Sequence, residues 1–230
     1  MEQPKSSSTM YAVSGVLLVV GLGVGFGIAK LMDNGMNTNS ASTTATTAPT
    51  SVTKAADLRT ALVSLGVSHM YLTEYAVNAA LDGNSDAAQV KTALLQNGTD
   101  ISAAVGSVYG QGAQDAFQKL WNIHLVDFVN YAVAGKKGDA AGKAAALADI
   151  NANYTKPISA LLAGANPNLP AATLETAFGD HVQMTAAVID DHNAGKFDQE
   201  QTDQAAAVKH IQGLMSTLAG AIVKQYPAKF

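Results

Sequence analysis

The sequence predicts an all-α protein, a helical bundle of about six helices made of three helix-hairpin repeats, with one further N-terminal transmembrane helix. Three observations support this fold class. Apolar residues recur at helical spacing through most of the chain, and no convincing alternating strand pattern is present. Five short segments rich in glycine, asparagine and proline interrupt the helical pattern. A run of uncharged, mostly apolar residues stands near the N-terminus.

The amino-acid composition favours a helical protein and argues against several functions. The 230 residues are 48% hydrophobic and only 14% charged, whereas soluble domains are usually about 25% charged. Such a composition favours closely packed helices. The net charge of −4 and the lack of a basic run argue against nucleic-acid binding, which needs clustered Lys and Arg. The chain has no cysteine, which excludes disulfides, thiolate metal ligands and a cysteine nucleophile.

The first element is a membrane anchor. Residues 11–29 read "YAVSGVLLVVGLGVGFGIA" without a charge and would span roughly 28 Å as a helix, close to the hydrocarbon thickness of a bilayer. We expect a short tail at 1–10 and the transmembrane anchor at 11–32. The run is longer than the core of a cleaved signal peptide and no clear A-x-A site follows, so an uncleaved anchor is favoured over a removed signal.

Glycines in this anchor permit close contact between helices. Gly21 with Gly25, and Gly23 with Gly27, form two overlapping small-xxx-small pairs. Such pairs would allow the anchor to associate with a second copy of the chain or with another membrane partner. Glycine is also simply common in membrane helices, and that alternative stays open.

A flexible stalk is predicted at residues 33–54. Its segment "NTNSASTTATTAPTSVT" is almost entirely Ser, Thr, Ala and Asn, a composition that cannot bury enough apolar surface to order itself. One anchor followed by a stalk places the domain at 55–230 outside the cytoplasm, attached to the cell membrane by a single pass. The charges that flank the anchor are too balanced to fix this orientation.

The domain at 55–230 contains the six helices. They are separated by "LDGNSD" (81–86), "VYGQG" (108–112), "GKKGD" (135–139), "GANPNLP" (164–170) and "NAGKFD" (193–198). Histidines at 69, 124 and 181 are 55 and 57 residues apart, and markers at Ile101, Ile158 and Met215 follow them by 32, 34 and 34 residues. This spacing predicts three helix-hairpin units. They could close into a bundle, in which the histidines converge, or stack as a solenoid, in which they do not.

Four histidines lie in or beside apolar helical stripes: His69, His124, His181 and His210. We expect them to face the core and to bind a metal ion, with Asp127 and Met184 as further or alternative ligands. Copper is favoured because imidazole and thioether suit it better than magnesium or calcium. Haem held by two histidines is the alternative cofactor.

A structural role competes with metal binding. A buried imidazole can donate to a carbonyl or a carboxylate and remain neutral, and Asp127 lies one turn after His124. The protein would then be a non-catalytic interaction module of the cell envelope. A di-iron Glu-x-x-His pair, an HExxH zinc motif, a CxxCH haem attachment and a G-x-S-x-G turn are all missing, so we do not expect an enzyme.

Residues 55–230 resemble a family of secreted or membrane-attached bacterial helical proteins of uncharacterised function. The resemblance rests on "LLQNGTDISAAVGSVYG" (94–110), "FQKLWNIHLVDFVNYA" (117–132), "LLAGANPNLP" (161–170), "DHVQMT" (180–185) and the end "AIVKQYPAKF" (221–230). The family usually has Phe where Tyr226 stands, and an acidic residue where Ser68 stands. The resemblance implies a helical fold, an envelope location and the same set of four histidines.

Overall fold

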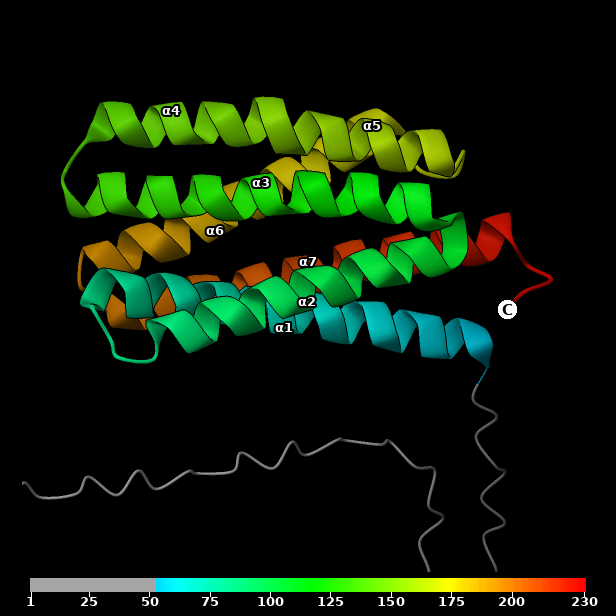
Figure 1. Cartoon of the computed structure of the whole chain (residues 1–230), viewed down its shortest axis with the longest axis horizontal. Coiled ribbons are helices and arrows are strands. Elements are labelled where there is room, and N and C mark those ends of the chain that lie inside the picture. The colour runs from blue at the N-terminus through cyan, green and yellow to red at the C-terminus, as the bar shows by residue number, and fades with distance from the viewer. Residues whose placement is uncertain (1–52) are drawn as a thin grey trace, which may run out of the picture. The chain divides into compact units, whose positions relative to one another are not determined.

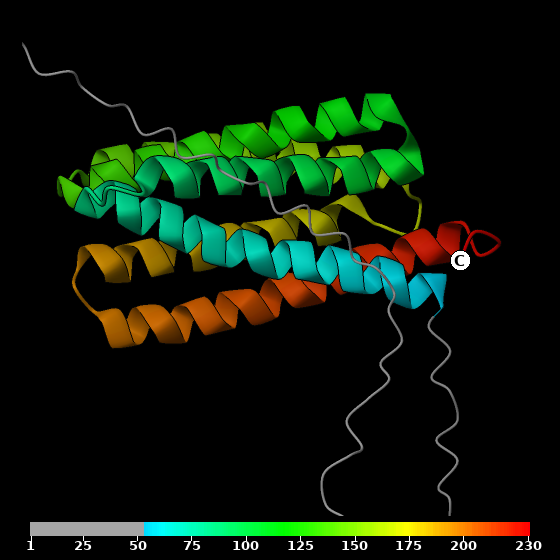
Figure 2. The same ribbon diagram turned by 60° about the horizontal axis from the view of Figure 1, so that its bottom comes forward.

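The computed structural model describes residues 53–230, which form an all-helical bundle (Figures 1 and 2). Its elements are α1 (Lys54–Asp82), α2 (Ala87–Tyr109), α3 (Gln111–Lys136), α4 (Ala140–Ile150), the π-helical segment η1 (Asn151–Thr155), α5 (Lys156–Ala165), α6 (Ala171–Asn193) and α7 (Phe197–Gln225). Because α4, η1 and α5 follow one another without a break, this part of the chain contains six helical rods and no strand. The predicted all-α bundle is confirmed.

The predicted N-terminal elements lie outside the described residues. These are the tail at 1–10, the anchor at 11–32 and nearly all of the stalk at 33–54. Within residues 53–230, no helix is both long enough and apolar enough to cross a membrane. The first helix begins at Lys54, where the side chain of Thr53 accepts a hydrogen bond from the backbone of Ala56. Such an N-cap satisfies one of the unpaired amides at the start of a helix.

The turns fall where the five breaks were predicted, and three of them share one geometry. After α1, Gly83 adopts a φ of 70°, and the backbone amide of Asn84 donates to the carbonyl of Ala79 at 2.9 Å. This left-handed ending is accessible to glycine because it has no Cβ. Gly138 and Gly195 end the first helix of the other two hairpins in the same way. Each hairpin is therefore closed by a glycine.

The fourth rod is one of the six predicted helices, but it contains the π-helical segment η1. Pro157 lacks a backbone N–H, and its ring collides with the carbonyl four residues earlier in a regular α-helix. The five residues of η1 stand immediately before this proline and widen the helix there. The widening turns Tyr154 and Thr155 into the core, where both are buried. Single-turn π segments of this kind often occur at functional sites.

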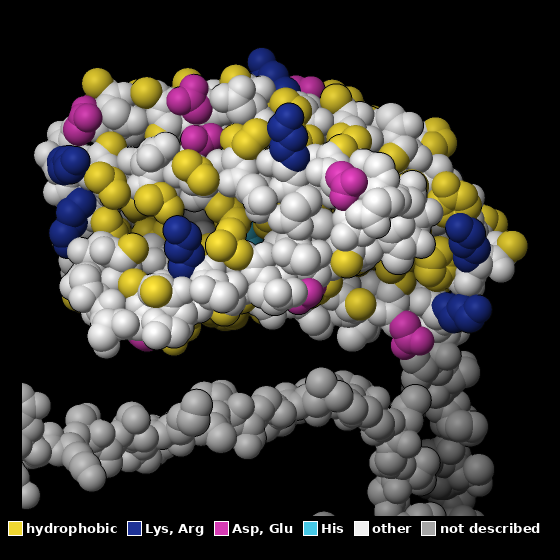
Figure 3. Space-filling model, in the orientation of Figure 1, with side chains coloured by type: hydrophobic (Ala, Val, Ile, Leu, Met, Phe, Trp, Pro, Cys, Tyr) yellow, Lys and Arg dark blue, Asp and Glu magenta, His cyan; other side chains and the backbone are white. Residues whose placement is uncertain are grey.

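The rods are arranged in a closed ring. Rods that are consecutive in the chain pack against each other, and α1 packs against α7 to close the ring. The first helices of the three hairpins, α1, α3 and α6, also contact one another in all three pairs. The middle of the bundle is therefore bounded by these three helices. Charged side chains are sparse on the face drawn in Figure 3, and both signs are interspersed there.

Candidate metal centre

Three of the four predicted histidines meet at the centre of the bundle. His69 lies on α1, His124 on α3 and His181 on α6. One ligand nitrogen from each lies within 4.8 Å of the others. The three side chains are 1%, 0% and 2% exposed. We call this group the histidine triad. Its convergence favours the bundle over the stacked solenoid, because a solenoid would hold equivalent residues in a row.

Each triad histidine comes from the helix that opens its hairpin, near the middle of that helix. The apolar stripes of α1, α3 and α6 all face the centre, so a histidine within a stripe is carried inward. The residues one turn further on are also buried, but none of them forms a hydrogen bond with an imidazole of the triad. The hydroxyls of Thr73 and Thr185 donate to the carbonyls of His69 and His181, at 2.8 and 2.9 Å. Phe128 stands at the equivalent position of α3.

Two aromatic side chains form a wall beside the triad. The ring of Tyr154 stacks on that of His124, with centroids 4.2 Å apart, and the ring of Trp121 lies 4.7 Å from that of His69 and 4.8 Å from that of His124. Trp121 can come this close to α2 because Gly98 faces it. A Cβ at Gly98 would stand 2.7 Å from an indole carbon, closer than van der Waals contact permits.

Polar atoms without a protein partner gather in this region. Within residues 53–230, eleven buried side-chain nitrogens and oxygens have no hydrogen-bond partner. Eight of the eleven belong to the triad and three neighbours, including five of the six imidazole nitrogens. The other three atoms of the eight are on Trp121, Tyr154 and Asn97. Native proteins normally satisfy buried polar groups, since each one left unpaired costs about 1 to 3 kcal/mol.

The triad histidines are held neutral. Burial lowers the pKa of His69 to about 3, and the neighbouring His181 contributes to this lowering. Burial and the proximity of His210 lower the pKa of His181 to about 4. The pKa of His124 is also well below its ordinary value, mainly through burial and then through its two triad neighbours. Neutral imidazoles keep a free lone pair, which is the form that binds metals.

The fourth predicted histidine is not one of the three converging ligands. His210, on α7, is only partly buried and its Nε2 pairs with the carbonyl of Ala177 at 2.9 Å. It lines a largely apolar groove of about 650 Å³ between α6 and α7, and Met184 lines the same groove. His210 and Met184 thus line one groove, and neither belongs to the group of converging histidines, although His210 lies close enough to His181 to lower its pKa.

Asp127 does not form the predicted pair with His124. Neither ring nitrogen of His124 has a hydrogen-bond partner, and one carboxylate oxygen of Asp127 is buried without one. Partial burial raises the pKa of Asp127, and the nearby carboxylate of Asp149 raises it further. Asp127 is thus not among the ligand atoms that converge at the triad.

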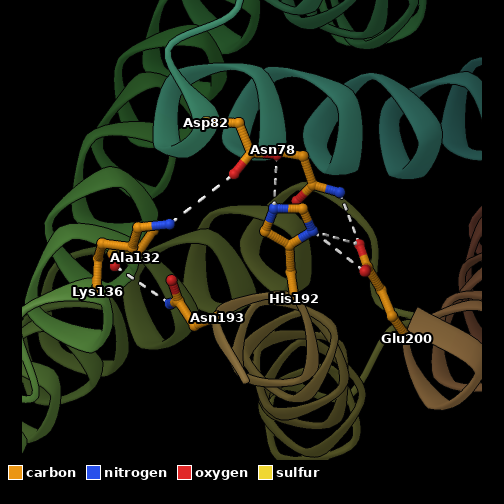
Figure 4. A network of polar contacts seen from close by, with 7 residues as sticks. All are labelled: Asn78, Asp82, Ala132, Lys136, His192, Asn193 and Glu200. Carbon is orange, nitrogen blue, oxygen red and sulfur yellow. Dashed lines mark hydrogen bonds and ion pairs between the residues drawn. The ribbon is translucent and has the colours of Figure 1, made fainter. Parts of the chain in front are cut away.

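The fifth histidine has a wholly different environment (Figure 4). His192, near the end of α6, points its Nδ1 at the carboxylate of Glu200, 3.1 Å away, and its Nε2 at that of Asp82, also 3.1 Å away. Asn78 donates to Glu200 at 2.6 Å, and Lys136 lies 3.9 Å from Asp82. We call this group the His192 network. It ties together the ends of α1, α6 and α7 and completes the hydrogen bonding of its histidine.

Comparisons of the chain with family models, with curated proteins and with solved structures found no match in any of the three. The resemblance to secreted helical proteins therefore stays a prediction. Three further residues of the site, Trp121, Tyr154 and Asn97, are not indicated by the spacing of the histidines. Pro157 was the one available signal for Tyr154, because a proline inside a helical pattern distorts the turn before it.

Proposed function

We propose that the histidine triad binds a single transition-metal ion and that the protein is a metal-binding module of the cell envelope. The observation that carries this proposal is the group of five buried imidazole nitrogens without a partner, on three rings whose ligand atoms lie within 4.8 Å of one another. One ion coordinated by all three rings would satisfy several of these atoms at once. The lowered pKa values favour binding further, because no proton has to be displaced at neutral pH.

Copper is the favoured metal. All three ligands of the triad are imidazoles, and no carboxylate belongs to the group. Magnesium and calcium require oxygen ligands and are disfavoured by such a set. Among first-row divalent ions, copper binds nitrogen ligands most tightly.

Haem fits this centre less well than an ion. A haem held by two histidines needs a slot for the porphyrin between the two rings. Here the third imidazole and the rings of Tyr154 and Trp121 lie within 4.2 to 5.9 Å of their histidine neighbours. The space around the triad is filled by aromatic side chains, which leaves room for an ion more readily than for a macrocycle.

A structural or interaction role is the second candidate, and one observation favours it. Val126, Val129 and Val133 follow helical spacing on α3 and are 60%, 48% and 41% exposed. An exposed apolar stripe is typical of a surface that contacts another protein. In that case the triad would be a packing element. Substituting Val129→Glu would then weaken self-association or partner capture without changing metal content.

An envelope location is the other part of the proposal. It is supported by the uncharged run at residues 11–29 and by the Ser/Thr/Ala-rich segment after it. The anchor would hold the domain outside the cytoplasm. Protease added to intact cells should degrade the domain, whereas an intracellular domain would be protected until the cells are lysed.

Metal binding is tested on the purified full-length chain in detergent. Copper, zinc and haem are each titrated, and bound metal is measured by atomic emission after dialysis against a weak chelator. We expect one copper ion per chain for wild type. A variant with His69, His124 and His181 all changed to alanine should bind none.

Two other variants control for loss of a histidine as such. His210→Ala and His192→Ala remove imidazoles whose nitrogens have partners elsewhere. Both should retain one copper per chain if they remain helical. Equal, weak binding by wild type and the triple variant would overturn the proposal and leave the structural role.

A further inference from the structure

We propose that the histidine triad selects monovalent copper, Cu(I), over divalent ions, because it offers a buried cation no negative charge. This inference rests on the proposed function and specifies the oxidation state of the ion that the same centre takes. It follows from two properties of the site, its charge and the number of its ligands.

The charge of the centre comes from its surroundings. The triad consists of neutral imidazoles that are at most 2% exposed. The group of side chains whose ligand atoms converge here contains three histidines and no carboxylate. Two carboxylates on the same helices have other neighbours. Glu74 accepts a hydrogen bond from Gln201, and Asp127 lies near Asp149.

No ligand of the triad is negatively charged, so the charge of a bound cation is not neutralised by its ligands. The cost of moving an ion from water into a low-dielectric interior grows with the square of its charge, so a divalent ion meets about four times the penalty of a monovalent one. Sites for divalent ions usually offset this cost with carboxylate or thiolate ligands. With three neutral ligands, a monovalent ion is therefore the better match.

The number of ligands leads to the same conclusion. Zinc in proteins is almost always four-coordinate, and a site with three protein ligands adds water or another exogenous group. His124 is 0% exposed, and Tyr154, also 0% exposed, stacks against it. The site is thus closed off from bulk water. Cu(I) accepts three nitrogen ligands without a fourth, and exclusion of water slows its oxidation.

The test compares affinities on the full-length chain under anaerobic conditions. Cu(I) is titrated in competition with bathocuproine disulfonate, and Zn(II) in competition with a zinc indicator. We expect Cu(I) to bind at least a hundredfold more tightly than Zn(II), with one ion per chain. Affinities equal within tenfold, or tighter binding of zinc, would overturn the inference.

An electrochemical measurement tests whether the site prefers Cu(I) to Cu(II). A hundredfold preference for Cu(I) over Cu(II) raises the potential of the bound couple by about 120 mV relative to free copper. The copper-loaded chain should therefore remain reduced, and silent in electron paramagnetic resonance, on brief exposure to air. A strong Cu(II) signal at a three-nitrogen site would contradict the inference.

An isosteric substitution tests the charge argument itself. Asn97 is 5% exposed, donates from Nδ2 to the carbonyl of Leu65 at 3.0 Å, and lies close enough to His69 to oppose in part the lowering of the His69 pKa by burial. Asn97→Asp places a carboxylate beside the triad. It should reduce the ratio of Cu(I) to Zn(II) affinity at least tenfold.

Asn166→Asp is the matched control. Asn166 is 0% exposed, but it follows α5 and bonds to Tyr109 and Asn168, not to a triad residue. A folded Asn166→Asp chain should retain the wild-type ratio. If both substitutions change the ratio equally, or neither does, the charge argument is wrong. Wild type that binds zinc and Cu(I) equally contradicts only this inference, whereas wild type that binds neither contradicts the proposed function as well.

Discussion

The triad and the His192 network show two ways in which one bundle accommodates histidine. In the His192 network both ring nitrogens lie 3.1 Å from a carboxylate, and Glu200 is kept at 2% exposure by its partners. In the triad three rings are buried as deeply, yet five of their six nitrogens have no partner in the protein. A histidine that serves only packing is expected to resemble His192. The triad departs from that pattern, and the departure is what indicates a ligand.

Acidification should affect the two regions most differently. The folded-state pKa values of His69 and His181, about 3 and about 4, lie below the value of about 6.5 expected when the chain is unfolded. The unfolded state therefore binds more protons below pH 6.5, and the stability of the metal-free protein should fall as pH drops from about 6.5 toward 3. Urea unfolding across this range measures the loss, which should reach several kcal/mol.

A triad variant separates this effect from the protonation of carboxylates. Metal-free His181→Leu should lose less stability than wild type between pH 6.5 and 4, because one of the suppressed protonation sites is gone. Parallel curves for the two proteins would mean that the triad does not control acid stability.

Copper should stabilise the protein through the triad and not through the His192 network. A ligand that binds only the folded state adds about 4 kcal/mol at a thousandfold excess over its Kd. Saturating copper should therefore raise the unfolding free energy of wild type by about that amount. His124→Leu should show no such gain, and His192→Leu should keep it. A gain of equal size in all three proteins would indicate binding elsewhere.

Removing His192 should destabilise the protein without any metal. His192→Leu leaves Glu200 buried with only Asn78 as a hydrogen-bond partner, and a buried polar group that loses its partner costs about 1 to 3 kcal/mol. Chemical denaturation of the metal-free chain measures this. Adding Glu200→Gln to the same chain should restore part of the loss. An unchanged midpoint for the single variant would mean that the network is weak.

A substitution on α2 can displace Trp121, one of the two aromatic side chains beside the triad. Gly98→Ala brings a Cβ to within 2.7 Å of the indole of Trp121, and overpacking of this kind costs about 1 to 3 kcal/mol. Copper affinity should fall as well, because Trp121 contacts both His69 and His124. Gly179→Ala is the control, since a Cβ there meets nothing within 4 Å. It should be neutral or slightly stabilising, as alanine favours the helix.

The smallest effect is expected from an apolar substitution in the triad. Metal-free His124→Leu at pH 7.5 loses no hydrogen bond within the protein, because neither ring nitrogen has a partner. Replacing unsatisfied polar atoms by apolar ones is close to neutral. We expect a change within about 1 kcal/mol, in contrast to His192→Leu. A loss of 3 kcal/mol or more would assign the triad a structural role.

The fold was predictable because its signals are local. The breaks at residues 81–86, 135–139 and 193–198 each hold a glycine that adopts a left-handed turn, and helical periodicity marks the segments between them. The N-terminal anchor and stalk stay predictions, since they precede the described residues.

The site was predictable only in part, because it depends on packing between distant helices. His69, His124 and His181 converge since α1, α3 and α6 contact one another in the centre. His210 has similar stripe spacing, but α7 is not one of the three helices that bound the centre, and the imidazole of His210 meets a backbone carbonyl. Tyr154 enters the site through the π segment before Pro157, a local distortion that periodicity does not reveal.

X-ray absorption on the copper-loaded full-length chain shows whether the triad is a metal centre. We predict one copper per chain with three imidazole nitrogens as its ligands, no sulfur from Met184, and loss of that signature in His124→Leu but not in His210→Ala. Copper bound through sulfur or carboxylate oxygen, or an unchanged spectrum in His124→Leu, would contradict this account.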